Sequence, residues 1–388
     1  MANARFHFPT QVHTGKDAMK AVPDIATRFG NKALLVTSRR QFQDSDLVER
    51  LHQNLLTKNI NTLVYDDTGV EGESVEVDQI ALLAKSARCD VVIGLGGDTV
   101  LNVAKAVALL CTNPGEASDY LTEQDGYRLQ IAREPLPTIL CPTAFGTLGE
   151  VTPGFVLKDP ADGFRKKLYN VKVAPTCAVM DPALTKGLSR KYVAASALLV
   201  LAYAIELYTS SEANPISDCF AEKAIELVHG VLPVVQKDPE NAEARSALQT
   251  ASLVLAYGAT AAPLGPIYAL CEAITSKMST YKGSLATVLL PQLMEYNLTS
   301  SPARYVQVVK FLGEDISQIS VLEAAIKAVE RVRLSIEAFN IPTRLGDLGF
   351  TRDLIPDVTQ IFSRFEESRY NARPIAAEDL RIILEQSL

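Results

Sequence analysis

The sequence lacks three features that mark whole classes of protein. Its six cysteines form no CxxC pair, and most stand in apolar surroundings, which predicts reduced core thiols. No apolar run reaches the roughly 18 residues of a membrane span, and the opening MANARFHFPT lacks the charged-then-apolar layout of a secretory signal. Basic residues are outnumbered, 38 Lys and Arg against 45 Asp and Glu, for a formal net charge of −7. These absences argue against a membrane protein and a nucleic-acid binder, and they predict a cytoplasmic location.

The order of apolar patterns along the 388 residues predicts two domains. Expected strands cover residues 32–38, 60–67, 90–97 and 136–143, and helix-period patterns between them cover 16–30, 44–58 and 74–88. Strands that alternate with helices are typical of βαβ units with a parallel sheet. This alternation stops near 177–185, and from about Leu188 nearly every pattern is helical. We therefore predict an α/β nucleotide-binding domain over residues 1–184 and an all-helical domain over residues 185–388, with a ligand cleft between them.

A glycine-rich turn follows the third expected strand. The stretch DVVIGLGGDTVLNVAK places Gly94, Gly96 and Gly97 after a buried strand and before a helix that begins near Asp98 or Thr99. Glycines let the backbone approach a ligand closely, and a helix N-terminus offers N–H groups to a phosphate. The spacing differs from the GxGxxG dinucleotide fingerprint. A tight strand–helix turn capped by Asp98 or Thr99 explains the same residues without a ligand.

Two further loops bear on the nucleotide question. The first expected strand ends in Ser38 and Arg39 rather than in an acidic residue, and an Arg at this place accommodates the 2′-phosphate of NADP. NADP is therefore favoured over NAD if a dinucleotide binds, although solvated surface arginines give the same pattern. The loop CPTAFGTLGEVT follows the fourth strand, and its Thr143 and Thr147 could donate hydroxyls to a phosphate or a ribose.

Taken together, these stretches resemble the iron-containing (group III) alcohol dehydrogenases. That family carries a turn of the form GGGSxxDxAK, then PTTAGTGSEVT, then DP-x-LT at the boundary to a helical domain. The corresponding stretches here are Gly96–Lys105, Pro142–Thr152 and Asp181–Thr185, in the same order and spacing. The resemblance covers nearly the full chain. It implies a Rossmann-like N-terminal domain, a helical C-terminal domain and a bound NAD(P).

The resemblance assigns cofactor-binding positions to both motifs. Residues that match the family are Gly96, Gly97, Lys105, Thr143, Gly146, Thr147 and Glu150. Asp98 stands at the third glycine of the family turn, Thr99 at its serine and Asn102 at its aspartate. A carboxylate at this helix N-terminus would compete with a pyrophosphate for the same N–H groups. Lys167, in the run GFRKKLY, lies near a family lysine that is close to the cofactor.

The stretch AASALLVLAYAIELY aligns with the metal-binding helix of the family. This helix has the form DALxHAIE, whose Asp and His lie one turn apart on one face and hold a divalent metal. The ungapped alignment places Leu199 at the Asp and Tyr203 at the His. The two further ligand histidines fall on Tyr268 and Lys282, and a histidine placed to assist substrate or proton transfer falls on Glu272. All four metal ligands of the family are thus replaced.

Without these ligands we expect no bound iron or zinc, because Leu cannot coordinate a metal and Lys is cationic at neutral pH. The histidines of the chain, His7, His13, His52 and His229, lie far from the ligand positions in sequence. Lys282 could instead supply the positive charge that stabilises the substrate oxygen. Tyr203 or Tyr268 could donate a proton, with a pKa lowered by the ammonium. Glu272 could pair with Lys282 and hold it in place.

Two functions remain open at this point. The first is a metal-independent NAD(P)-dependent oxidoreductase of the alcohol dehydrogenase or carbonyl reductase type. It would act on a small-molecule substrate, and an anionic one would suit the lysine. The second is a non-catalytic relative that keeps the fold as a binding or assembly module, in which Tyr and Leu fill the former metal site. Members of the family are commonly dimers or larger, so a homodimer is expected by resemblance.

Overall fold

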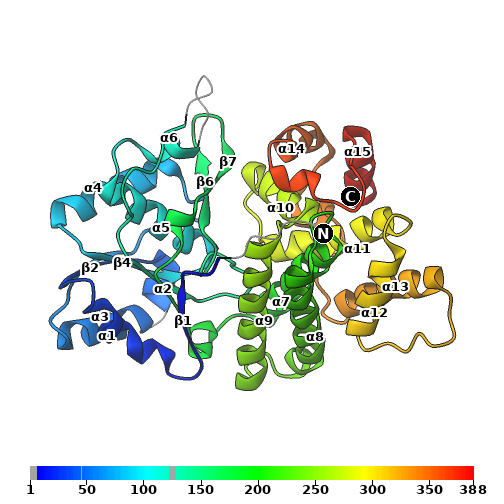
Figure 1. The fold of residues 1–388 in the computed structure, drawn as a ribbon, viewed down its shortest axis with the longest axis horizontal. Coiled ribbons are helices and arrows are strands. Elements are labelled where there is room, and N and C mark those ends of the chain that lie inside the picture. Colours follow the sequence, from blue (N-terminus) through cyan, green and yellow to red (C-terminus); the bar gives the residue numbers. More distant parts are fainter. Residues whose placement is uncertain (1–6, 45, 122–127) are drawn as a thin grey trace. The chain divides into compact units, whose positions relative to one another are not determined.

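The computed structural model describes residues 7–44, 46–121 and 128–388. The chain divides into two compact units. The α/β unit covers Phe8–Lys186, and the helical unit holds Gly187–Leu388 (Figure 1). The division after Lys186 lies two residues beyond the one expected from the sequence.

The α/β unit is built on a parallel sheet, which in the described residues has six strands in the order β1-β8-β5-β4-β2-β3. Every neighbouring pair in this sheet is parallel. The strands are β1 (Gln11–Thr14), β2 (Lys32–Val36), β3 (Asn61–Tyr65), β4 (Val91–Gly96), β5 (Thr138–Pro142) and β8 (Cys177–Met180). The expected βαβ arrangement and the four expected strands are confirmed.

Alternate residues of the central strands supply two separate cores. Leu34 and Val92 face one core, and Leu35 and Ile93 face the other, because successive side chains of a strand point to opposite faces. The first core is covered by α4 (Ser74–Ala87), α5 (Asp98–Thr112) and α6 (Ala117–Leu121). The second is covered by α1 (Val22–Ala26) and α3 (Leu47–Thr57), and the short α2 (Arg39–Asp44) follows β2. Burial on both faces explains why these strands are continuous apolar runs.

Three features of the α/β unit differ from the sequence-based expectation. The region 16–30 holds only a 3-10 turn (Ala18–Ala21) and the short α1, and not one long helix. The alternation does not stop at 177–185, because β8 joins the sheet there beside β1 and β5. An unexpected antiparallel hairpin pairs β6 (Gly154–Asp159) with β7 (Phe164–Tyr169). Charged residues on one side of this hairpin concealed the apolar Phe155, Leu157 and Leu168 that pack into the core.

The helical unit is organised around α7 (Arg190–Thr209), which is buried from Val193 to Thr209. The remaining helices are α8 (Pro215–Lys237), α9 (Ala242–Ala261), α10 (Pro266–Lys277), α11 (Lys282–Asn297), α12 (Pro302–Phe311), α13 (Val321–Glu337), α14 (Ile355–Phe362) and α15 (Ala377–Gln386). Short 3-10 turns lie at 171–173, 182–185, 346–348, 352–354 and 366–369. Ser189 caps α7 by accepting a hydrogen bond from the Tyr192 backbone N–H at 3.3 Å.

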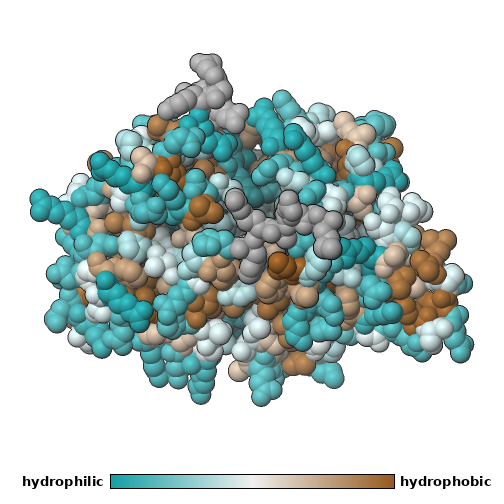
Figure 2. Space-filling view, viewed as in Figure 1, coloured by the Kyte–Doolittle hydropathy of each residue, from teal (hydrophilic) through white to brown (hydrophobic). Residues whose placement is uncertain are grey.

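Among the described residues, α7 is the single helix long and apolar enough by itself to cross a membrane, but 94% of its apolar window is buried inside the protein. A helix that is apolar on all sides and packed against neighbours is typical of a core helix. Its main partners are α8 and α11. Exposed apolar side chains gather instead near the start of α13, at Ile319, Val321, Leu322 and Ile326, in the brown area over α12 and α13 in Figure 2.

Candidate functional site

The carboxyl ends of β2, β4 and β5 meet at one edge of the sheet. The strand order changes direction here, because β2 has β3 on one side and β4 on the other. Ligands of open α/β sheets bind at such a switch point. The Thr37 hydroxyl, directly after β2, donates to the Leu95 carbonyl of β4 at 2.8 Å. The Thr143 backbone N–H, directly after β5, donates to the Gly96 carbonyl at 2.9 Å. The structure thus brings together the three loops singled out in the sequence.

The glycine turn leaves the start of α5 without a side-chain cap. Gly97 is the N-cap residue, so the expectation that Asp98 or Thr99 caps the helix is wrong. Asp98 is the first helical residue, and the Thr99 hydroxyl donates to the Val70 carbonyl at 3.2 Å. A Cβ on Gly97 would meet nothing within 4 Å, whereas one on Gly96 would lie 2.6 Å from the Cβ of Val100. Gly96 therefore allows close strand–helix packing, and Gly97 faces open space beside the N–H groups of the first helical turn, which fits a phosphate.

The Lys105 ammonium is engaged by backbone carbonyls of the protein itself. Its side chain is fully buried, and its ammonium donates to the Gly154 carbonyl of β6 and, at 3.4 Å, to the Thr152 carbonyl. Burial lowers the pKa of Lys105 to about 8. Asn102 is buried one turn earlier on the same helix. Lys105 thus ties α5 to the hairpin, and a contact with a cofactor remains a prediction for both residues.

In the loop after β5, one of the two threonines predicted to bind the cofactor has an internal partner. The Thr147 hydroxyl donates to the buried Glu150 carboxyl at 2.5 Å. Burial raises the pKa of Glu150, and the hydrogen bond from Thr147 opposes this effect. The other oxygen of Glu150 has no hydrogen-bond partner in the described structure. Thr143 is buried beside the end of β4.

Polar contacts place the predicted NADP-selecting residues at the end of β2. The Ser38 hydroxyl accepts a hydrogen bond from the Gln41 backbone N–H at 3.3 Å, at the start of α2. Arg39 forms an exposed ion pair with Asp67, 2.8 Å between nitrogen and oxygen. Asp67 follows β3, which pairs with β2 in the sheet. The sequence did not predict the contact between Asp67 and Arg39, because the two residues are far apart along the chain.

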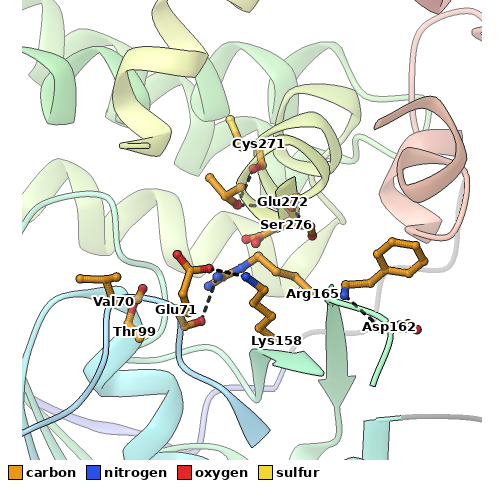
Figure 3. Close-up of polar contacts among 11 residues, drawn as sticks. Val70, Glu71, Thr99, Lys158, Asp162, Arg165, Cys271, Glu272 and Ser276 are labelled. Carbon is orange, nitrogen blue, oxygen red and sulfur yellow. Dashed lines mark hydrogen bonds and ion pairs between the residues drawn. The ribbon is translucent and has the colours of Figure 1, made fainter. Parts of the chain in front are cut away.

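The hairpin carries a group of basic side chains next to the segment that precedes α4. Lys158 of β6 forms an ion pair with Glu71 at 3.0 Å, and the nearly buried Arg165 of β7 donates to the Glu71 carbonyl at 3.0 Å (Figure 3). The predicted cofactor residue Lys167 lies on β7 with its ammonium 5.5 Å from the centre of the Tyr169 ring. Lys158 was missed in the sequence because the hairpin itself was missed.

In the helical unit, α7, α10 and α11 bring the four predicted catalytic residues together. The Tyr203 ring on α7 lies against the Tyr268 ring on α10, with centroids 5.8 Å apart. Lys282, the first residue of α11, forms an ion pair with Glu272 of α10, 2.5 Å between Nζ and Oε1. Leu199 is buried on α7 one turn before Tyr203. Part of α10, with Cys271, Glu272 and Ser276, is drawn in Figure 3.

The environment of Tyr203 is opposite to the one expected. Its side chain is 2% exposed, and burial together with nearby acidic groups raises its pKa well above 10. The predicted lowering by Lys282 is therefore wrong for Tyr203. Burial raises the pKa of the neighbouring Cys271 thiol, and the Tyr203 hydroxyl close to its sulfur opposes this rise only in part. Tyr268 is only partly buried.

Sequence reasoning missed Glu206, which closes the apolar stretch of α7. Its buried carboxyl accepts hydrogen bonds from the Ile267 backbone N–H and, at 3.3 Å, from that of Tyr268. Glu206 thus caps the first turn of α10, the helix that carries Tyr268 and Glu272. Burial raises the pKa of Glu206 to about 8, against the effect of these hydrogen bonds. A lone acidic residue at the end of an apolar run was the signal in the sequence.

The side chains at this place do not fit the metal that the resemblance implies. Leu199 offers no donor atom, and the Lys282 ammonium is engaged by Glu272. No group of three or more His, Cys, Asp or Glu side chains able to hold a metal ion occurs among residues 7–44, 46–121 and 128–388. The donor set differs from the nitrogen, oxygen and sulfur ligands that bind iron or zinc in proteins.

A Rossmann-like unit with an open glycine turn and a helical unit are the two parts of a dehydrogenase architecture. Comparison with known proteins makes this assignment specific. Residues 9–182 match the family described as iron-containing alcohol dehydrogenase, and residues 193–388 match its C-terminal domain family. The chain therefore belongs to the iron-containing alcohol dehydrogenase family.

Proteins that resemble this chain over almost its whole length are oxidoreductases. The chain is 28% identical to long-chain-alcohol dehydrogenase 1 of Geobacillus thermodenitrificans, with 99% of this chain and 97% of the relative covered. It is 24% identical to the NAD-dependent methanol dehydrogenase of Bacillus methanolicus, with 99% of each covered. A solved 1,3-propanediol oxidoreductase superposes with a TM-score of 0.93 at 24% identity, covering 100% of both chains. A sulfoacetaldehyde reductase from Bifidobacterium kashiwanohense in complex with NAD+ gives 0.86 at 25% identity, covering 100% of this chain and 99% of the other.

Proposed function

We propose that this chain is a nicotinamide-dependent oxidoreductase that interconverts a small alcohol and its carbonyl compound without a metal ion. The observation that carries the proposal is the Lys282–Glu272 ion pair, in which Glu272 lies one helical turn after Tyr268 on α10, at positions where the resemblance places histidines. An ammonium can stabilise the negative charge that develops on a substrate oxygen, which is the task of the metal in the family. The substrate is a small molecule, and its place between the two domains stays a prediction.

The α/β unit supports a nicotinamide cofactor, which supplies the hydride in this chemistry. The backbone N–H groups at the start of α5, next to Gly97, can bind a phosphate. Arg39 follows β2, where an arginine can accommodate a 2′-phosphate, and this supports NADP. The methanol dehydrogenase and the sulfoacetaldehyde reductase named above use or bind NAD by their descriptions, so NAD is the alternative.

Within the helical unit, Lys282 and Tyr268 suit the reaction better than Tyr203. The Lys282 side chain is 17% exposed and Tyr268 is partly buried, so a substrate can reach both. The ammonium carries three N–H donors, and the ion pair with Glu272 engages at least one of them. Tyr203 is closed off and holds its proton firmly. We therefore assign Lys282 to charge stabilisation, Tyr268 to proton transfer, and Tyr203 to packing against the Tyr268 ring.

The burial of Tyr203 and Leu199 also favours the second candidate, a non-catalytic relative. In that protein the two apolar surfaces fill the volume of the lost metal, and the Lys282–Glu272 pair has a structural role. The two candidates make different predictions for turnover. Both allow a nucleotide to bind at the glycine turn.

The test is a titration of the chelator-treated full-length protein with NADPH and NADH, followed by a screen of small aldehydes and ketones. The chain has no Trp, so energy transfer from tyrosine to the reduced nicotinamide reports binding with low background. We expect micromolar NADPH binding, equivalent to about 8 kcal/mol, and turnover that resists chelators. Lys282→Ala should keep the binding and lose most of the turnover, by roughly a hundredfold.

Failure can take two forms. Nucleotide binding without turnover of any carbonyl compound would favour the non-catalytic relative. Turnover that chelators abolish and added iron or zinc restores would contradict the metal-independent mechanism, since the described side chains offer no such site.

A further inference from the structure

A cavity lies at the amino-terminal end of the parallel sheet, whereas the glycine turn stands at the carboxyl end. It is lined by Thr138 and Thr176, at the starts of β5 and β8, and by Lys105 and Ala108 of α5. The segments that lead into β5 and β8 supply most of the remaining lining. All of these residues belong to the α/β unit. The cavity is therefore separate from the predicted catalytic residues and from the expected phosphate site.

The size and the walls of this cavity suit a small molecule. Its volume is about 250 Å³. Because a cavity of roughly 150 Å³ accommodates benzene, this one has room for up to about ten non-hydrogen atoms. Pro135 and Pro175 in the lining have a fixed φ angle and no N–H group. The Leu136 backbone N–H donates to the Ala108 carbonyl at 3.0 Å and so holds one wall against α5.

The polar side chains of the lining are mainly hydrogen-bond donors. The Thr176 hydroxyl accepts from the Thr138 backbone N–H at 3.1 Å, and the Thr138 hydroxyl accepts from that of Thr176 at 3.4 Å. Each hydroxyl can still donate its own hydrogen. On the solvent side, the Lys172 ammonium donates to the Ile131 carbonyl at 3.0 Å and lies 3.8 Å from the Glu134 carboxyl. The Glu134 side chain is 76% exposed, so water screens its negative charge.

Lys105 adds a positive charge that is buried. Its side chain is 1% exposed, and its hydrogen-bond partners in the described part of the chain are the neutral backbone carbonyls of Thr152 and Gly154. Burial lowers the pKa of Lys105 to about 8, so the ammonium form still predominates at pH 7. A buried charge with neutral partners is costly, and an anion placed beside it offsets part of that cost. The cavity next to Lys105 therefore favours an anionic ligand over a neutral one.

We propose that this cavity is a binding site for a short-chain carboxylate. The anionic group is stabilised by Lys105 and Lys172 and accepts hydrogen bonds from the threonine hydroxyls, since charge-assisted hydrogen bonds are the strong ones. The short carbon chain packs against the apolar part of the lining, such as Ala108 and Val173. An inorganic anion would leave this apolar part without a partner. The site does not depend on the proposed function, because it uses other residues and another end of the sheet.

The experiment is a calorimetric titration of the full-length protein with butanoate at pH 7, with butanamide as an uncharged molecule of the same size. We expect one butanoate per chain, bound at least about tenfold more tightly than butanamide. An anion beside Lys105 favours its ammonium form, so binding at pH 8 should take up protons. Titrations in buffers of different ionisation enthalpy measure this uptake. Asp98, Glu150 and Lys167 also act on the Lys105 charge, and Lys105→Met shows whether the uptake belongs to the lysine.

Two further variants keep the test independent of the stability of Lys105→Met. Ala108→Leu fills part of the cavity and should weaken butanoate binding by at least about tenfold. Lys172→Met removes the partly exposed cation and should weaken it by roughly fivefold. The matched control is Lys58→Met, which removes another exposed lysine of the α/β unit, paired with Asp24 at 2.6 Å. The control should stay within about twofold of the wild type, and thermal melting verifies that each variant is folded.

The outcomes separate this cavity from the other anion sites of the chain. Binding that Lys282→Ala abolishes and Ala108→Leu leaves unchanged would place the carboxylate at the proposed substrate site and overturn the inference. Equal affinities for butanoate and butanamide, or an equal loss in Lys58→Met and Lys172→Met, would overturn the selection for an anion. No saturable binding up to about 10 mM would overturn the site itself. Nicotinamide binding and turnover are measured separately, so none of these results decides the proposed function.

Discussion

The two ends of the candidate machinery have diverged to different degrees from the family pattern. The sheet edge keeps Gly96, Gly97 and Lys105 of the glycine turn, and its geometry leaves Gly97 facing open space. In the helical unit, two of the positions that the resemblance assigns to metal ligands hold the buried Leu199 and Tyr203. The difference teaches that a phosphate site made of backbone N–H groups tolerates side-chain exchange, whereas a metal site made of side chains does not.

The largest effect is expected from restoring the metal ligands of the family in the helical unit. The variant Leu199→Asp, Tyr203→His, Tyr268→His and Lys282→His restores an oxygen donor and three imidazoles at positions that the fold already brings together. We expect it to bind about one Zn²⁺ per chain at micromolar or lower concentration, because this ligand set suits zinc. Metal analysis after gel filtration and calorimetry give the readout, and the parent protein is the control. Equal metal content in both would show that the helices no longer present these positions to a common point.

The next largest effect concerns the sheet edge, where two adjacent glycines should respond differently. Gly97→Val adds a branched side chain in open space at an extended backbone position, so it should weaken NADPH binding by at least about tenfold with little change in Tm. Gly96→Ala pushes a Cβ to 2.6 Å from Val100 and should lower Tm by several degrees, as overpacking does. Thermal melting and tyrosine-to-nicotinamide energy transfer measure both. Unchanged affinity in Gly97→Val would place the phosphates elsewhere.

The sequence predicted the parallel sheet well, because the sheet follows from local patterns, and the meeting of the loops follows from the sheet. Four apolar runs gave four strands, and parallel strands bring their carboxyl ends to one edge. The short β1 and β8, and the hairpin with its alternating charges, lack such a signal and are set by pairing with strands distant in sequence. The helical unit brings the four predicted catalytic residues together, as the resemblance implied. Its protonation was not predictable, because the pKa of Tyr203 depends on burial, which no spacing in the sequence encodes.

A smaller effect is expected from Glu206 on the pH dependence of stability. Its pKa is raised from 4.5 to about 8 in the folded protein, so between these values the folded state keeps a proton that the unfolded state has lost. The free energy of unfolding should therefore fall as pH rises through this window, by up to several kcal/mol, and level off above about pH 8. Glu206→Gln cannot ionise and should flatten this part of the curve. Urea unfolding at a series of pH values measures it, and a slope that survives in the variant would assign it to other groups, such as the buried Glu150.

The smallest expected effect is on the choice between the two nicotinamide cofactors. Arg39 and Asp67 form an exposed pair, so the interaction itself is worth at most about 1 kcal/mol. Arg39→Ala should weaken NADPH relative to NADH by roughly fivefold, because the arginine no longer meets the 2′-phosphate. Asp67→Asn should act in the opposite direction by releasing Arg39, with Arg50→Ala, which breaks an exposed pair on α3, as the control. The ratio of the two dissociation constants decides the matter. If both variants leave this ratio unchanged, Arg39 is a solvated surface residue. The end of β2 then sets no preference between NADP and NAD, and any nucleotide binding depends on the glycine turn.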